Sequence, residues 1–231
     1  CNAVGRARRS LRFGSHGAPH EGGHGLAGRE SLVDHAADLF RDRHLDHYVG
    51  LCLPFDIGFW PSRLALKVGV DRDNIRAAVK WAGLVGRWED AGRIVYGASD
   101  VLQNQPEDLL RLALECLGHL VDADPMNTAG LQTVVILMSI QLDDFAEVDA
   151  RIEVLQTSTD RFLVAVAVQW RTFSEFQANQ PEACLASCLE ADELVAEMPD
   201  SIAKSQLLCV TGITAGWANG YLGNHKQVRE D

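Results

Sequence analysis

The chain has 231 residues, of which 47% are hydrophobic and 23% are charged, and its 32 acidic residues outnumber its 21 basic ones. The net charge of −11 argues against a protein whose whole surface binds nucleic acid or anionic lipid. No uninterrupted apolar stretch of about 18 residues occurs, so the sequence predicts no membrane span. The composition fits one large globular domain or two small ones and does not indicate a function.

The charge is unevenly distributed along the chain. Residues 1–28 carry a net charge of +3, residues 29–104 carry −1, and residues 105–231 carry −13. We therefore expect a partner of the second half to be basic, or to be met through apolar contacts, rather than to be a phosphate backbone. Direct contact between this half and nucleic acid is not predicted.

The first segment, residues 1–28, is predicted to be a disordered basic tail. It is rich in Gly, Arg and His and has no apolar periodicity that would anchor it. The spacing of His16, His20 and His24 would line one face of a helix and could hold a metal ion. The intervening glycines and Pro19 disfavour that helix, so no metal site is predicted. The arginines of the segment could contact nucleic acid, but a solvated tail is the preferred interpretation.

The cysteines indicate a reducing compartment. Cys116, Cys184, Cys188 and Cys209 lie within apolar helical patterns, where a free thiol behaves as a small hydrophobic group. Cys184 and Cys188 are four residues apart, which is not the CxxC spacing of a redox or zinc site. No secretory signal is visible, because the basic start leads into glycine and histidine rather than an apolar stretch. We predict reduced core cysteines in a cytoplasmic protein, with a metal or disulfide role as the alternative.

From residue 29 onward the sequence predicts a helical-repeat domain. A first helix starts at Ser31, and its apolar stripe is formed by Leu32, Ala36, Phe40, His44 and Tyr48. An irregular connection follows at residues 55–70. Further helices are predicted near residues 71–85, 91–101, 106–122, 145–155 and 203–221. The apolar segments 134–137 and 162–168 could be strands by composition, but a lone strand would have no partner, so both are predicted to be buried helices.

Four turns share a local pattern, in which a turn residue ends one helix and a small apolar residue follows five positions later. The pairs are Gly86 with Ala91, Asp143 with Val148, Asn179 with Cys184, and Gly223 with Val228. Successive turns are 57, 36 and 44 residues apart. Antiparallel helix pairs that recur every ~34–45 residues are typical of tetratricopeptide-like solenoids. Gly216, which precedes the last turn, is a further small residue of this pattern.

The predicted fold class is therefore all-α. Residues 29–70 form a first helix and a connection, and residues 71–231 form an irregular tetratricopeptide-like array of antiparallel helix pairs, an α-solenoid. A plain helical bundle is the alternative. The sequence contains no phosphate-binding loop, dinucleotide fingerprint, HExxH or GxSxG motif. Acidic pairs such as Asp143 and Asp144 lie at turns or helix surfaces, so no catalytic, cofactor or metal residue is nominated and the chain is not predicted to be an enzyme.

Two segments in the first half, Arg41–Tyr48 (RDRHLDHY) and Val70–Ala82 (VDRDNIRAAVKWA), resemble parts of large bacterial ATP-binding transcriptional regulators of the LuxR and antibiotic-regulator types. The resemblance covers residues 33–102, and beyond it the similarity is to helical repeats in general. In that family the first motif follows an ATPase and a winged-helix module, and the second opens a tetratricopeptide-like region. The resemblance implies a sensor or scaffold segment that transmits partner or ligand binding to an ATPase switch and a DNA-binding end.

The chain departs from the full family pattern. It contains no phosphate-binding loop and no recognisable C-terminal helix-turn-helix. A Gly/His/Arg-rich start replaces winged-helix sequence, and Asp231 interrupts a repeat. We therefore expect a fragment, a truncated paralogue or a misread gene start, and we carry over neither ATP hydrolysis nor DNA binding.

The second motif also supplies the candidate contact residues. Asp71 is predicted to cap a helix, and Asp73 and Asn74 to lie in its polar first turn, where negative charge favours the helix dipole. Arg76 and Lys80 form a basic strip beside Asp73. This strip is either solvated or docks a neighbouring module. Trp81, like the other tryptophans, is expected to pack against an apolar stripe.

These observations support three functional hypotheses. The first is a non-catalytic helical-repeat module of a bacterial transcriptional regulator that acts through protein contacts. The second is a free-standing tetratricopeptide-like adaptor that binds a peptide in a concave groove. The third, a helical enzyme, has no motif to support it.

Overall fold

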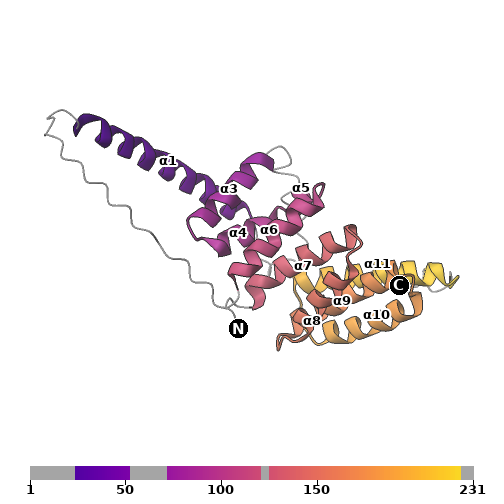
Figure 1. The fold of residues 1–231 in the computed structure, drawn as a ribbon. Helices are drawn as coiled ribbons and strands as arrows, with labels where there is room; N and C mark the ends of the chain where they lie inside the picture. The colour runs from indigo at the N-terminus through magenta and orange to yellow at the C-terminus, as the bar shows by residue number, and fades with distance from the viewer. Residues whose placement is uncertain (1–23, 53–71, 121–124, 225–231) are drawn as a thin grey trace, which may run out of the picture. The chain divides into compact units, whose positions relative to one another are not determined.

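The computed structural model of the chain describes residues 24–52, 72–120 and 125–224, with side chains for residues 35–52, 72–120 and 128–224. Over these residues the chain forms helices and no strands (Figure 1), which confirms the all-α prediction for the described part. The helices are α1 (His24–Leu51), α3 (Arg72–Leu84), α4 (Trp88–Gly97), α5 (Ser99–Leu102), α6 (Pro106–His119), α7 (Pro125–Gln141), α8 (Phe145–Gln156), α9 (Arg161–Gln177), α10 (Pro181–Ala196) and α11 (Ile202–Tyr221). The two apolar segments of ambiguous composition lie within α7 and α9.

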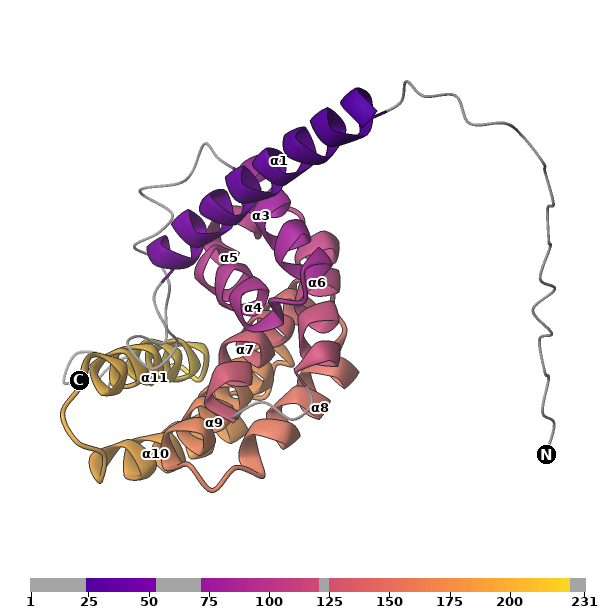
Figure 2. The ribbon, with the colours of Figure 1, turned by 90° about the vertical axis from the view of Figure 1, so that its left-hand side faces the viewer.

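The chain divides into two units, Cys1–Phe40 and Arg41–Asp231. In the second unit, successive helices from α3 to α11 pack against one another, as can be followed along the ribbon (Figures 1 and 2). Helix α4 also contacts α7, and α9 also contacts α11. Most buried apolar side chains belong to one core cluster that runs from the end of α1 to α11. A helix of this unit is therefore stabilised mainly by the helices next to it in sequence.

Helix α1 differs from its predicted form in two ways. It begins at His24, so it includes the last residues of the predicted disordered tail. On its predicted apolar stripe Tyr48 is buried, but Phe40 is 71% exposed and Leu45 is buried instead. In a helix with 3.6 residues per turn, side chains spaced four residues apart rotate by about 40° around the axis at each step. The predicted stripe therefore turns gradually away from the core. His16, His20, the connection 55–70 and Asp71 lie outside the described residues.

The four predicted turn residues have positive φ angles, and no other described residue does. The angles are 77° at Gly86, 57° at Asp143, 61° at Asn179 and 76° at Gly223. Glycine adopts this left-handed conformation without steric cost, and aspartate and asparagine adopt it more readily than other side chains. The chemical identity of the turn residues is thus matched to the backbone conformation that ends each helix.

Each of these turns has the same pair of backbone hydrogen bonds. The N–H of the residue after the positive-φ residue donates to the carbonyl five residues earlier: Arg87 to Ala82 (2.8 Å), Asp144 to Ser139 (2.9 Å), Gln180 to Glu175 (2.9 Å) and Asn224 to Asn219 (2.9 Å). The positive-φ residue itself donates to the carbonyl three residues earlier. This is the Schellman motif, which satisfies carbonyls that a helix end would leave unpaired.

The first three of these turns join their two helices without further loop residues. Arg87, Asp144 and Gln180 follow the positive-φ residue, and each directly precedes the next helix. The small residues five positions after the turn residues, Ala91, Val148 and Cys184, are fully buried. A short side chain at this point allows the second helix to approach the first closely. Val228, the corresponding residue after Gly223, lies outside the described residues.

Four of the five described cysteines are buried free thiols, and Cys209 is exposed. The prediction of a core position for Cys209 is therefore wrong. Leu207 and Thr211 of α11 face the neighbouring helices, and Cys209 lies half a turn away from them, where no described element covers the helix. Trp217 and Tyr221 of the same helix are also exposed.

A candidate contact groove between helices α3 and α6

Arg76 and Lys80 line a groove formed by α3, α4 and α6. Helix α3 buries Ile75, Ala78, Val79 and Ala82, and the two basic residues lie on its flank. The groove has a volume of about 600 Å³. It is lined by Arg76, Val79, Lys80, Gly83, Leu84, Trp88, Asp108, Arg111, Leu112, Glu115, Cys116 and His119. The candidate contact residues thus belong to a concave surface rather than to an open helix face.

One half of the groove carries a ladder of ion pairs in which Asp108 is shared. Its Oδ2 lies 3.7 Å from Arg76, and its Oδ1 lies 3.6 Å from Arg111. Arg111 also lies 3.9 Å from Glu115, and Arg76 donates a hydrogen bond to Gln105. These side chains are partly exposed, so each pair contributes little to stability. The ladder instead holds the two guanidinium groups in place.

Lys80 is the uncompensated charge of the groove. It is exposed, and no ion pair or hydrogen bond joins it to another described residue. The lining as a whole carries three basic and two acidic side chains besides His119. In a chain of net charge −11, this surface is locally cationic and offers one free ammonium to an acidic group.

The other end of the groove is aromatic and apolar. The rings of Trp88 and His119 are stacked, with centroids 3.7 Å apart and planes inclined by 7°. Gly83 lies beneath the indole, and a Cβ atom at this position would be 2.9 Å from the Trp88 ring. Leu84, next to Gly83, is 70% exposed. A segment bound in the groove would therefore meet a basic end and an apolar end.

The two segments that carry the family resemblance pack against each other. The indole Nε1 of Trp81 donates a hydrogen bond of 2.8 Å to Asp42 Oδ1, and the guanidinium of Arg41 lies 5.1 Å from the same ring. Asp46 lies 2.8 Å from Arg87, whose pKa is raised chiefly by its hydrogen bond with Asp46. Residues 41–48 (RDRHLDHY) thus pack on α3, which carries the second segment, and on the Gly86 turn that ends α3.

The remaining predicted residues have structural positions. Asp73 and Asn74 are exposed in the first turn of α3. Ala91 is buried behind the Gly86 turn, and an added Cβ at Gly216 would meet nothing within 4 Å. The sequence did not nominate Trp88, Arg111 or His119, because no local pattern shows that α6 lies beside α3.

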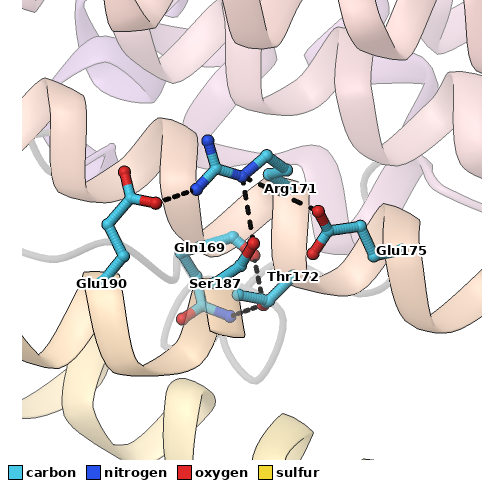
Figure 3. A network of polar contacts seen from close by, with 6 residues as sticks. All are labelled: Gln169, Arg171, Thr172, Glu175, Ser187 and Glu190. Carbon is cyan, nitrogen blue, oxygen red and sulfur yellow. Dashed lines mark hydrogen bonds and ion pairs between the residues drawn. The ribbon is translucent and has the colours of Figure 1, made fainter. Parts of the chain in front are cut away.

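A second polar cluster joins α9 to α10 (Figure 3). Arg171 Nε donates a hydrogen bond of 3.1 Å to Ser187 Oγ and lies 3.9 Å from Glu175, and its other side binds Glu190. In the buried interior nearby, Gln169 Nε2 donates a hydrogen bond of 3.2 Å to Thr172 Oγ1. The cluster holds carboxylates and a hydroxyl but no histidine or thiolate, so we assign it a role in fixing α9 against α10.

Two of the four buried thiols, those of Cys52 and Cys116, are poorly suited to act as nucleophiles or metal ligands. Burial raises the pKa of Cys52 from 9.0 to about 12, and burial also raises that of Cys116 to about 12. A thiol must ionise to act as a nucleophile or metal ligand, so both are inert near neutral pH. Within the described residues, no group of three His, Cys, Asp or Glu side chains is placed to hold a metal ion. None of the helices in the described part is long and apolar enough to cross a bilayer.

Comparison with known proteins found no matching family model, no curated relative and no solved structure of similar fold.

Proposed function

We propose that this chain is a non-catalytic, tetratricopeptide-like scaffold or sensor module of a bacterial transcriptional regulator, working in the cytoplasm through protein contacts. One observation carries the proposal: the two segments that resemble the regulators form one packed unit, joined by Trp81 to Asp42 and by Arg87 to Asp46. A resemblance shared by two distant segments is stronger when those segments contact each other.

The repeated turns support the tetratricopeptide-like part of the proposal. Three helix pairs are closed by the same Schellman motif and by a fully buried small residue five positions later. Helix α9 contacts both α10 and α11, as the first helix of one repeat contacts its own partner and the first helix of the next. The extra helix α6 makes the array irregular.

The groove favours a second candidate, a free-standing adaptor that binds a peptide. Its free ammonium at Lys80 and exposed Leu84 are the features expected of a surface for an acidic segment with an apolar residue. The two candidates share the groove and differ in its occupant, which is a module of the same regulator in the first and an independent protein in the second.

The regulator proposal is tested first at the DNA level. Sequencing the DNA upstream of the coding region should show, in the same reading frame, an ATPase with a phosphate-binding loop followed by a winged-helix module. A stop codon in that frame, with no ATPase sequence upstream, would overturn the regulator assignment and leave the adaptor.

Site-specific photocrosslinking then tests the groove. We expect a photoreactive residue at Lys80 to crosslink to the ATPase or winged-helix portion of the regulator in cells that express the complete protein. The matched control is the same residue at Arg43, which is exposed on α1 outside the groove. A crosslink to an unrelated protein at position 80 favours the adaptor. Equal crosslinking at both positions contradicts a role for the groove.

A further inference from the structure

Helix α10 carries two buried thiols one turn apart, on the same face of the helix. Cys184 is fully buried, and Cys188 is 3% exposed. Cys188 Sγ donates a hydrogen bond of 3.8 Å to the carbonyl oxygen of Thr211 on α11. The two thiols also interact with each other, and the pKa of Cys184 is lowered chiefly because its thiolate accepts a hydrogen bond from Cys188. We call Cys184 and Cys188 the α10 thiol pair.

The α10 thiol pair is separate from the main core. It belongs to a smaller apolar cluster that includes Ala218 of α11. Phe176, Leu185 and Ala215 pack against this cluster and remain partly exposed. Because the cluster is distinct from the main core among the described residues, an opening of the end of α11 uncovers the thiols without unfolding the rest of the chain. A small uncharged ligand can therefore reach the pair.

A carboxylate oxygen without a hydrogen-bond partner lies near the pair. Glu175 Oε2, on α9, is buried, and no described residue donates a hydrogen bond to it. The other oxygen, Oε1, lies 3.9 Å from Arg171 (Figure 3). The negative charge of Glu175 opposes ionisation of both thiols, which places the carboxylate close to them. A buried acceptor without a donor is costly, and a ligand bound to the thiols could supply that donor.

The spacing of the thiols favours a bridge of one atom over a direct disulfide. Side chains four residues apart on a helix have Cβ atoms about 5–6 Å apart. A disulfide requires Cβ atoms about 3.5–4.5 Å apart, so a direct bond would distort α10. An atom between the two sulfurs adds a second bond to the span and closes the ring without this distortion.

Charge and bond angle select the bridging atom. Two thiolates around copper(I) carry a net negative charge, which is costly in an apolar cluster beside Glu175. Zinc requires more ligands than two thiolates, and within the described residues no group of three His, Cys, Asp or Glu side chains is placed to hold a metal ion. Mercury(II) holds two thiolates on opposite sides in a line, whereas these two thiols lie within hydrogen-bonding reach of each other. Trivalent arsenic forms angled bonds to two sulfurs and leaves a neutral product.

We propose that the α10 thiol pair binds trivalent arsenic, taken up as arsenous acid. The two thiols replace two hydroxyl groups of As(OH)3: two S–H and two As–O bonds break, two As–S bonds form, and two water molecules leave. Arsenic stays trivalent, so the step needs no oxidant or reductant. The remaining hydroxyl on arsenic donates a hydrogen bond to Oε2 of Glu175. This site depends neither on the groove between α3 and α6 nor on the regulator assignment.

Stoichiometry and spectroscopy of the reduced full chain test the proposal. The chain is incubated with arsenite, and free arsenite is removed by gel filtration. We expect one arsenic atom per chain, and X-ray absorption at the arsenic edge should show two sulfur neighbours and one oxygen neighbour. A chain that retains no arsenic overturns the proposal. Arsenic with one or three sulfur neighbours also overturns it, because the pair supplies two.

Cysteine variants then locate the site. Cys184→Ala and Cys188→Ala should each lower the affinity for arsenite at least about tenfold, because a single thiol cannot chelate. Cys116→Ala is the matched control, since it removes a buried thiol outside the pair, and Cys209→Ser removes the exposed thiol. Circular dichroism establishes that the variants fold. Binding that survives unchanged in Cys184→Ala, or that is lost in either control, contradicts the assignment.

The contact with Glu175 is tested by comparing two arsenicals. Glu175→Gln should weaken the binding of arsenite about tenfold, because it removes the charge of the acceptor. The same variant should leave the binding of methylarsonous acid unchanged, because a methyl group replaces the remaining hydroxyl in that product. The comparison separates the lost contact from any general effect on α9. An equal loss for both arsenicals overturns the role of Glu175.

Discussion

The indole N–H of Trp81 donates a hydrogen bond of 2.8 Å to the carboxylate of Asp42, across 39 residues of sequence. This bond joins the end of α1 to α3, and therefore the two segments that resemble the regulators. Arg41 lies over the same indole, so the tryptophan is held on its face by a cation and at its edge by an anion. Trp81 thus attaches the C-terminal end of α1, residues 41–51, to α3.

We expect Trp81→Phe and Asp42→Ala each to lower the free energy of unfolding, because each removes a hydrogen bond between a charged acceptor and a partly buried donor. The expected loss from the bond itself is about 1–3 kcal/mol. Urea unfolding of both single variants and the double variant measures the coupling between the residues. Additive effects would show that the bond does not contribute to holding residues 41–51 of α1 on α3.

Alanine should have opposite effects at a glycine of positive φ in a Schellman turn and at a glycine inside a helix. Gly86→Ala places a Cβ atom at a φ of 77° and should cost about 1–2 kcal/mol, because a side chain in this conformation crowds the following carbonyl. Gly118→Ala is the control, since its Cβ would meet nothing within 4 Å in the helix α6. It should be neutral or stabilise by up to about 1 kcal/mol. Thermal or urea unfolding distinguishes the two results.

Asn179→Gly offers a converse test at the turn between α9 and α10. Asparagine has a φ of 61° here, and glycine relieves the remaining strain without loss of a described side-chain hydrogen bond. We expect unchanged or slightly raised stability, within about 0.5 kcal/mol. A marked loss in the same urea assay would show that the asparagine side chain has a contact of its own.

The positions of helices and turns were accessible from sequence because both depend on local chemistry. Apolar periodicity indicates a helix whatever its neighbours are, and Gly, Asp and Asn tolerate positive φ. Which side of a helix faces solvent depends on distant segments. Cys209 and Trp217 lie on apolar positions of α11, and only the locations of α9 and α10 show that these positions are uncovered.

Local sequence likewise predicts only part of the groove between α3 and α6. The four-residue spacing of Arg76 and Lys80 placed both on one flank of α3, which is a local inference. Arg111 and His119 complete the groove from α6, and their approach depends on how α6 packs against α4 and α7. A contact between segments about 35 residues apart leaves no periodic signal in either of them.

Gly83→Ala should disturb the aromatic end of the groove. The new Cβ would lie 2.9 Å from the Trp88 ring, so the indole must move away from its stacked position on His119. We expect a loss of about 1–3 kcal/mol in the free energy of unfolding and a red shift of tryptophan emission as Trp88 becomes hydrated. Trp88→Phe in the same background identifies the emitting residue. Unchanged emission would contradict the position of this ring.

A buried polar contact ties α11 to α9. The hydroxyl of Thr211 donates to the carbonyl oxygen of the Gln169 side chain, and Gln169 is 2% exposed. Thr211→Val keeps the shape but leaves this oxygen without its donor, so it should cost about 1–3 kcal/mol. Adding Gln169→Met removes the unsatisfied group and should restore part of that loss. A double variant as unstable as the sum of the two single variants would contradict this account.

The buried thiols of Cys52 and Cys116 predict how stability depends on alkaline pH. Burial raises the pKa of Cys52 and Cys116 from 9.0 to about 12 in the folded chain, whereas the unfolded chain ionises them near the ordinary value. The folded state therefore binds more protons than the unfolded state above pH 9. Stability is fully present below pH 9 and falls as the pH rises towards 12, by about 1.4 kcal/mol per pH unit for each thiol.

Alkylation with iodoacetamide measures the same difference directly. At pH 8 we expect the exposed Cys209 to react while Cys52 and Cys116 react only in denaturant, because the folded chain both covers these thiols and disfavours their thiolates. In Cys52→Ala and Cys116→Ala variants, the slope of stability against pH above 9 should become shallower, although each variant also leaves a small cavity. A slope that stays the same in both variants would show that other groups cause the alkaline loss.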